Sequence, residues 1–163
     1  MAFLGDRNII SYTYMRQTGW YNRNSTSWGE VSTAYRISVV PKRSDSHIIV
    51  KYQFNTSTPT NHALNQHRIY NVTDSSVPDQ PTQGSGQNRA LSHCTTRGQY
   101  NADNARNINM TASLGSWSGT KVFTVHTCSW ASDLVRHLHS AGNSDSTVHW
   151  SNHLWAEAWE LED

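Results

Sequence analysis

The sequence predicts an all-β fold: a β-sandwich or jelly roll of about seven to eight antiparallel strands, with long polar loops and at most one short helix. Composition is the first reason, because the β-branched residues Val, Ile and Thr greatly outnumber the helix formers Lys and Glu. Patterning is the second, because short runs alternate apolar and polar residues between clusters of turn formers. The length of 163 residues fits one domain, so we expect a single sandwich over residues 1–163.

Composition and charge argue against several other classes of protein. A mean hydropathy of −0.68 and the absence of any run near the roughly 20 apolar residues of a transmembrane helix predict no membrane insertion. A net charge of +1 gives no electrostatic attraction to nucleic acid. The first residues lack a basic, apolar leader, so we expect no signal peptide. Without export, Cys94 and Cys128 are expected to be free thiols.

The clearest predicted element is a β-hairpin around residues 41–46. The run before this segment and the run after it both alternate apolar and polar residues, which is typical of half-buried strands. Pro, Ser and Asp between the runs supply turn chemistry. The residues predicted to point inward are Tyr35, Ile37, Val39, Ile48, Val50, Tyr52 and Phe54.

Further strands are expected along the rest of the chain. The runs I-I-S-Y-T-Y-M, I-N-M-T-A-S-L and K-V-F-T-V-H-T-C have strand composition, and the last places Phe123 and Val125 in the core. Residues 55–106 read as a long, polar, loop-rich insertion, with short strands at H-R-I-Y-N-V and R-A-L-S-H-C.

Two segments have ambiguous or helical signals. A short helix is predicted over 132–139, where Ser132 is a suitable N-cap and Gly142 a suitable C-terminal stop. The final run, 146–161, fits a strand, in which Trp155, Trp159 and Leu161 share a face. It also fits a helix, in which Trp155 and Trp159 stack one turn apart.

Aromatic residues beside polar loops are candidates for binding sugars, because flat rings stack on sugar faces while Asn and Arg bond to hydroxyls. The alternative for each ring is a place in the core or at a subunit interface, where Trp and Tyr are enriched. The candidate glycan-binding residues are Trp20, Tyr21, Trp28, Trp117 and Trp130.

The C-terminal segment is a candidate subunit interface. We assign Trp155 and Trp159 to the core or an interface, and Glu160 to the interface. The acidic tail, which includes Glu162 and Asp163, serves either solubility or pairing with basic groups on a neighbouring subunit.

The segment from Ser25 to Phe54 resembles a region of phage tail-fibre and other virion-surface proteins, especially those of marine phages. In those proteins a Ser/Thr run leads to a strand ending in I-T-P, a small polar turn and a K-I-L-I/V strand. Here Val39–Pro41 and His47–Val50 hold the matching places, and Leu154–Leu161 is a counterpart of the family's last strand. His47 replaces the usual Lys, and residues 55–106 have no counterpart. The resemblance favours a strand at the C-terminus.

The resemblance implies a non-enzymatic virion structural protein: a tail fibre, knob or head-decoration domain of a bacteriophage, expected to form a trimer. Its partners would be copies of itself, other capsid or tail proteins and host-surface polysaccharide used for attachment. It would be assembled in the host cytoplasm and located in the virion. Some phage fibre tips thread an H-x-H motif along a three-fold axis to bind one metal ion, which makes His137 and His139 candidate metal ligands. His149 and His153 form a second spaced pair. No other cofactor is expected.

Catalytic motifs are absent from the sequence. It contains no G-x-S-x-G, H-E-x-x-H, P-loop or C-x-x-C pattern. Paired carboxylates can hydrolyse glycosides, but Glu157 and Glu160 would face opposite sides of a strand. We therefore expect no enzyme. The alternatives are a lectin-like receptor-binding module and, third, a polysaccharide depolymerase.

Overall fold

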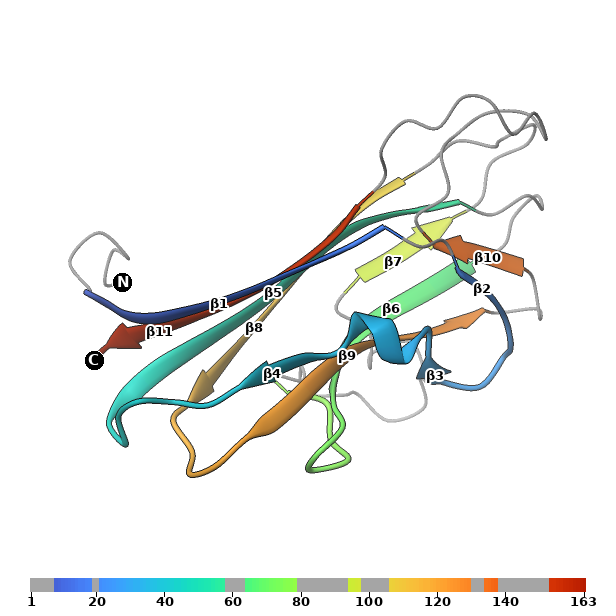
Figure 1. Ribbon diagram of the computed structural model, residues 1–163. Helices are drawn as coiled ribbons and strands as arrows, with labels where there is room; N and C mark the ends of the chain where they lie inside the picture. The colour runs from blue at the N-terminus through green and yellow to red at the C-terminus, as the bar shows by residue number, and fades with distance from the viewer. Residues whose placement is uncertain are drawn as a thin grey trace.

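The structure, a computed structural model, describes residues 8–18, 21–57, 64–78, 94–97, 106–129, 134–137 and 153–163. These residues form two antiparallel sheets packed face to face (Figure 1), which confirms the all-β sandwich. The finer jelly-roll connectivity stays a prediction. Within the described ranges, no helix is long and apolar enough to cross a membrane.

Sheet A is built on the long strand β5. Strand β11 and then β10 pair along one edge of β5, β8 pairs along the other edge, β1 pairs with β11, and β2 pairs with β10. The C-terminal strand β11 therefore lies between β1 and β5. The strands of sheet A are β1 (Ile9–Gln17), β2 (Tyr21–Asn24), β5 (Ser46–Ser57), β8 (Arg106–Gly115), β10 (Leu134–His137) and β11 (Leu154–Glu162).

Sheet B is built on β9 in the same manner. Strands β4 and β3 pair in succession along one edge of β9, and β6 and then β7 lie on the other side. A 3-10 turn, η2 (Thr33–Tyr35), precedes β4, and Ser32 caps it by accepting a bond from the Ala34 amide. The strands of sheet B are β3 (Gly29–Glu30), β4 (Ile37–Val39), β6 (Leu64–Asn71), β7 (Cys94–Arg97) and β9 (Lys121–Ser129).

The core between the sheets contains the residues that the alternating pattern predicts. Every inward-facing residue predicted for the two runs around residues 41–46, together with Phe123 and Val125, is at most 5% exposed. The hydroxyl group of Tyr52 on sheet A lies 3.0 Å from the carbonyl oxygen of Tyr35 and 2.8 Å from that of Phe123. This buried group therefore joins the two layers.

The predicted β-hairpin at residues 41–46 is wrong in its pairing. Both strands exist, but β4 pairs with β9 in sheet B and β5 pairs with β8 and β11 in sheet A. The chain crosses from one sheet to the other between them (Figure 1). Alternation shows that a strand has one buried face, but a strand opposite in the other layer satisfies that pattern as well as a neighbour in the same sheet.

Two other predictions are corrected. The helix expected over 132–139 is absent at its centre, because Leu134–His137 is strand β10, paired with both β2 and β5. A short helix gains little by itself, so two available strand edges outweigh its capping signals. The described residues form eleven strands, more than the seven to eight expected, because strands of two to four residues are too short to show alternation.

Candidate interaction surface

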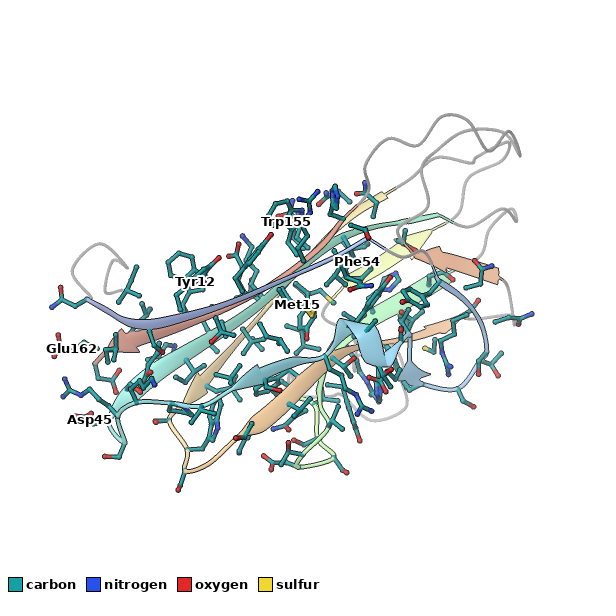
Figure 2. The ribbon with its side chains drawn as sticks, in the orientation of Figure 1. Tyr12, Met15, Asp45, Phe54, Trp155 and Glu162 are labelled. Atoms are coloured by element: carbon teal, nitrogen blue, oxygen red, sulfur yellow. The ribbon has the colours of Figure 1, made fainter. Side chains whose placement is uncertain are left out.

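Four aromatic side chains lie on the side of sheet A that faces away from sheet B; we call this set the aromatic face. Tyr12 and Tyr14 come from β1, and Trp155 and Trp159 come from β11. Figure 2 shows Tyr12 and Trp155 on this outer side and Met15 on the opposite side of β1. Tyr12 is 48%, Tyr14 42% and Trp155 39% exposed, which is unusual for neighbouring large rings.

The strand register brings these rings together. Tyr12 is directly opposite Trp159, and their ring centroids are 4.7 Å apart in an edge-on arrangement. The Tyr14 and Trp155 centroids are 5.5 Å apart, and Tyr12 and Tyr14 are 6.4 Å apart with nearly parallel planes. The four rings therefore form one continuous cluster.

Three charged side chains lie among the rings. Glu157 is opposite Tyr14 on one side and Lys51 on the other, and it accepts a 3.1 Å bond from the Trp159 indole. The Arg16 guanidinium lies 5.4 Å from the Trp155 ring centroid. No carboxylate lies within ion-pair distance of Lys51 in the described part of the chain.

The local environment also changes the acidity of a tyrosine in the aromatic face. Desolvation, followed by the nearby Glu157 carboxylate, raises the pKa of Tyr12. The phenol is therefore neutral near pH 7 and can donate a hydrogen bond.

Beyond β11 the same face becomes polar. The register continues from Trp155 to Gln53 and then to Asn109. The Asn109 amide donates to Asn107 at 2.7 Å, and Asn107 donates to Asn55 at 3.2 Å. The outer face of sheet A is thus aromatic over β1 and β11 and amide-rich over β5 and β8.

Trp155 and Trp159 do not lie in the core. Leu154, Ala156 and Ala158 occupy the inward positions of β11, and the two tryptophans alternate with them on the outside. Their assignment to an interface stays a prediction.

The sequence analysis assigned Glu160 to an interface, but the structure shows it buried within the fold of this chain, 2% exposed. Its carboxylate accepts bonds from the amides of Lys42 and Arg43 and from the hydroxyls of Ser11 and Ser46, at 2.7–2.9 Å. Burial raises the pKa of Glu160, but these bonds outweigh it and lower the pKa below its usual value. Glu160 therefore fixes the connection between β4 and β5.

The candidate sugar-binding residues do not form one platform. Tyr21 packs edge-on against Tyr35 beside the core, with centroids 5.2 Å apart. Trp28 lies beside Arg68 and next to sheet B. Trp117 packs against Phe123 at 5.7 Å. Trp20 and Trp130 lie outside the described residues.

The metal prediction falls on parts of the chain that the structure does not describe. His137 belongs to β10, but its side chain is not described, and His139 and His149 lie outside the described ranges. Among the described residues, no group of three His, Cys, Asp or Glu is arranged to hold a metal ion. Cys128 is a free, buried thiol, as predicted, and the Cys94 side chain is not described.

Tyr12 and Tyr14 were not identified from the sequence as candidate functional residues. The signal was present, because Tyr12, Tyr14 and Arg16 alternate with Thr13 and Met15 in the first strand. The alternation fits equally well a strand with both tyrosines in the core, because a period of two does not say which face is buried.

The fold and this surface define an all-β sandwich with an exposed aromatic face. Comparison with known proteins adds little: no family model matches the chain, and no curated protein matches it. Among solved structures, a chain from the structure of infectious bursal disease virus, Gx strain, is similar at a TM-score of 0.31 and 9% sequence identity. The match covers 94% of this chain and 40% of the viral chain.

Proposed function

We propose that this chain is a non-enzymatic structural protein of a virion surface that self-associates through the aromatic face. The observation that carries the proposal is the cluster of four rings on the outside of sheet A, with three of them more than a third exposed. A patch of this kind on a soluble domain is typical of a contact surface. The phage tail-fibre, knob or capsid-decoration setting is supported by the resemblance of Ser25–Phe54 to virion-surface proteins.

The occupant of the face that we favour is a second copy of this chain, because the face is complementary to itself. Consider a two-fold axis that runs parallel to the strands, between β11 and β5. Because Glu157 and Lys51 are register partners on these strands, each Glu157 then lies over the Lys51 of the other copy. Trp159 and Ile49 are register partners too, so they also meet across the axis.

A structural role also agrees with the state of three of the four glutamates. Glu160 is buried and fully hydrogen-bonded, Glu162 pairs with Arg43, and Glu30 pairs with Arg36. These carboxylates are occupied by contacts within the fold.

The direct test is sedimentation of the purified chain over a range of concentrations. We expect reversible association by the wild type and at least about tenfold weaker association by Trp155→Ser, because a tryptophan at the centre of an interface is worth about 2 kcal/mol or more. Val40→Ser, which removes an exposed apolar side chain outside the aromatic face, is the matched control and should associate like the wild type. A wild-type protein that stays monomeric at about 100 µM would overturn the proposal, because even a weak dimer associates measurably at that concentration.

Charge reversal tests the two-fold geometry. Lys51→Glu and Glu157→Lys should each weaken association alone, because like charges then meet. A mixture of the two single variants should restore it, since each carboxylate again faces an ammonium group. A trimer unaffected by these charges would support the three-fold assembly that the sequence predicts, with a different contact between copies.

The position in the particle needs a separate experiment. Labelling of intact virions with an antibody against this chain, followed by electron microscopy, should show it on the capsid or the tail. The chain's absence from purified particles would contradict a virion role, whatever its oligomeric state.

A lectin-like role is the second candidate, and one observation favours it: Trp155 is followed across the sheet by the amides of Gln53 and Asn109. A ring bordered by amides suits a sugar, because the ring stacks on C–H groups and the amides bond to hydroxyls. Binding on a glycan array that is lost in Trp155→Ala, in a protein that remains monomeric, would favour this role. Release of reducing ends from host polysaccharide would instead indicate a depolymerase.

A further inference from the structure

A second cluster of chemically distinctive side chains lies on sheet B, on the face turned away from the core. Arg68 on β6 is the register partner of His126 on β9, and His126 is the register partner of Glu30 on β3. Tyr70 lies two residues along β6 from Arg68, and Trp28 lies two residues before Glu30. We call this set, with Arg68 at its centre, the Arg68 cluster.

The Arg68 cluster is a stack of flat groups. The Arg68 guanidinium lies 4.1 Å from the Trp28 ring centroid and 5.5 Å from that of Tyr70. Tyr70 in turn stacks on His126, with centroids 3.8 Å apart and planes within 16°. Stacking on aromatic rings uses the flat faces of a guanidinium and leaves the N–H groups around its edge available for bonds in its own plane.

Those edge groups lack a matching anion within the described part of the chain. Arg68 is only 9% exposed, its Nε atom is buried, and neither this atom nor the buried Nδ1 atom of His126 has a hydrogen-bond partner there. Glu30 is already held by two 2.8 Å bonds from Arg36 and one of 2.9 Å from Thr124. A buried cation without an anion is costly, so its retention calls for an explanation.

A second arginine adds to the positive charge of this region. Arg23 donates to the carbonyl oxygens of Thr127 and Ser27 at 3.0 and 2.9 Å, and no described carboxylate pairs with it. Carbonyl groups satisfy its donors but do not neutralise its charge. The one carboxylate of the Arg68 cluster, Glu30, is already paired with Arg36, so neither Arg68 nor the nearby Arg23 has a described carboxylate as its counter-ion.

We propose that the Arg68 cluster is a binding site for the carboxylate of an acidic sugar, held by the edge of the Arg68 guanidinium and by the His126 imidazole. A carboxylate is planar and matches the donor pairs at the edge of a guanidinium. The inference concerns sheet B and is independent of the proposed contact on sheet A.

The protonation states in the cluster fit a ligand with a single negative charge. Burial, with help from the Arg68 charge, lowers the pKa of His126 to about 4, so the imidazole is neutral near pH 7. Burial also raises the pKa of the Cys128 thiol, which keeps that neighbour uncharged.

A sugar suits the surroundings better than an acidic peptide does. The groups beside Arg68 on the same face are neutral and polar: the Gln66 amide and the Tyr70 phenol. Gln66 accepts a 3.3 Å bond from Cys128 through its carbonyl oxygen, and its amide N–H groups have no bond within the described part of the chain. Sugar hydroxyls can bond to such groups, whereas the aliphatic stem of an aspartate or glutamate cannot.

NMR titration of the full chain with sodium glucuronate tests the site directly. We expect shifts of the Trp28 indole N–H and of the His126 ring signals that saturate, with glucose producing none at the same concentrations. Sodium acetate should bind more weakly than glucuronate at the same signals. A blocked glutamate, N-acetylglutamate amide, should also bind more weakly.

Two variants and one control make the test specific. Arg68→Met should weaken glucuronate binding at least tenfold, and Arg68→Lys should weaken it as well, because an ammonium group lacks the planar fork. Arg43→Gln, an exposed arginine elsewhere, should bind like the wild type. Without ligand, Arg68→Met should unfold at the wild-type temperature or above, because it removes a buried charge that has no counter-ion.

Four results would each overturn the proposal. They are equal shifts with glucose, unchanged glucuronate binding by Arg68→Met, a lower unfolding temperature of Arg68→Met without ligand, and blocked glutamate binding as tightly as glucuronate. The third would make Arg68 a structural residue, and the fourth would indicate a protein partner.

Discussion

Two buried polar side chains, Tyr52 and His67, show how single residues hold this sandwich together. Tyr52 is 0% exposed, and its hydroxyl joins the β5 layer to two carbonyl groups of the opposite layer. His67 is 0% exposed, lies 2.9 Å from the Thr127 hydroxyl through its Nδ1 atom and packs edge-on against Phe54. Each polar group stands in an apolar interior, where a lost partner is costly.

Replacement of Tyr52 by Phe removes the hydroxyl group that bonds to the carbonyl oxygens of Tyr35 and Phe123. We expect Tyr52→Phe to lower the free energy of unfolding by about 1–3 kcal/mol, measured by urea denaturation. Tyr14→Phe, which changes an exposed phenol, is the control and should change stability by less than about 0.5 kcal/mol. Equal effects of the two variants would show that the hydroxyl group of Tyr52 does not join the layers.

His67 should make the protein sensitive to mild acid. Burial lowers the pKa of His67 to about 3, whereas an unfolded histidine has a pKa of about 6.5. Below pH 6.5 the His67 imidazole is therefore protonated in the unfolded chain but stays neutral in the folded chain. The free energy of unfolding keeps the whole contribution of His67 above pH 6.5. It falls as the pH drops toward 3, by up to about 1.4 kcal/mol per pH unit.

The measurement is thermal unfolding of the wild type and of His67→Gln between pH 7 and pH 4.5. The unfolding temperature of His67→Gln should fall less steeply as the pH decreases. Part of the pH dependence should remain, because the pKa of His126 is also lowered. Parallel profiles for the two proteins would mean that His67 is not the responsible group.

At the scale of elements, the connection between β4 and β5 depends on Glu160. Its carboxylate accepts two backbone amides of that connection and two hydroxyls. We expect Glu160→Gln to destabilise the protein by about 2–4 kcal/mol, because an amide N–H₂ would face donors in a buried place. Glu162→Gln, which weakens an exposed ion pair with Arg43, should lower the free energy of unfolding much less than Glu160→Gln in the same denaturation experiment. Similar losses would contradict the role assigned to Glu160.

The elements also show what the sequence could predict. Alternation correctly identified the buried residues of β5 and the core residues Phe123 and Val125, because burial of one face is a local property of a strand. The partner of β4 could not be predicted, since that depends on whether the chain turns within a sheet or crosses between sheets. Strand β10 was missed because Ser132 and Gly142 resemble helix caps, and its pairing with β2 and β5 is a long-range effect.

The candidate surfaces were predictable in part only. Trp155 and Trp159 stood out as large rings in a strand-like run, but neighbouring tyrosines reach them only through the pairing of β1 with β11. The Arg68 cluster could not be predicted, because its members come from three strands and their contacts arise from strand register.

At the scale of the whole molecule, association through the aromatic face should couple to stability. A contact that forms between folded chains raises the unfolding temperature as concentration increases. We expect the wild type to show this dependence, and Trp155→Ser to unfold at one temperature from dilute to concentrated solution. Differential scanning calorimetry at several concentrations provides the measurement. If the unfolding temperature of the wild type does not change with concentration, self-association through a native surface is contradicted.

The place of β11 between β1 and β5 has a consequence for how the protein comes into being. Strand β11 is an inner strand of sheet A, so during synthesis β1 has to wait for a partner that lies far along the sequence. A chain cut short by a premature stop before Leu154 would lose two ladders at once and leave β1 and one edge of β5 bare. Such fragments should aggregate, so the completion of sheet A is in effect a check that translation has passed Glu162.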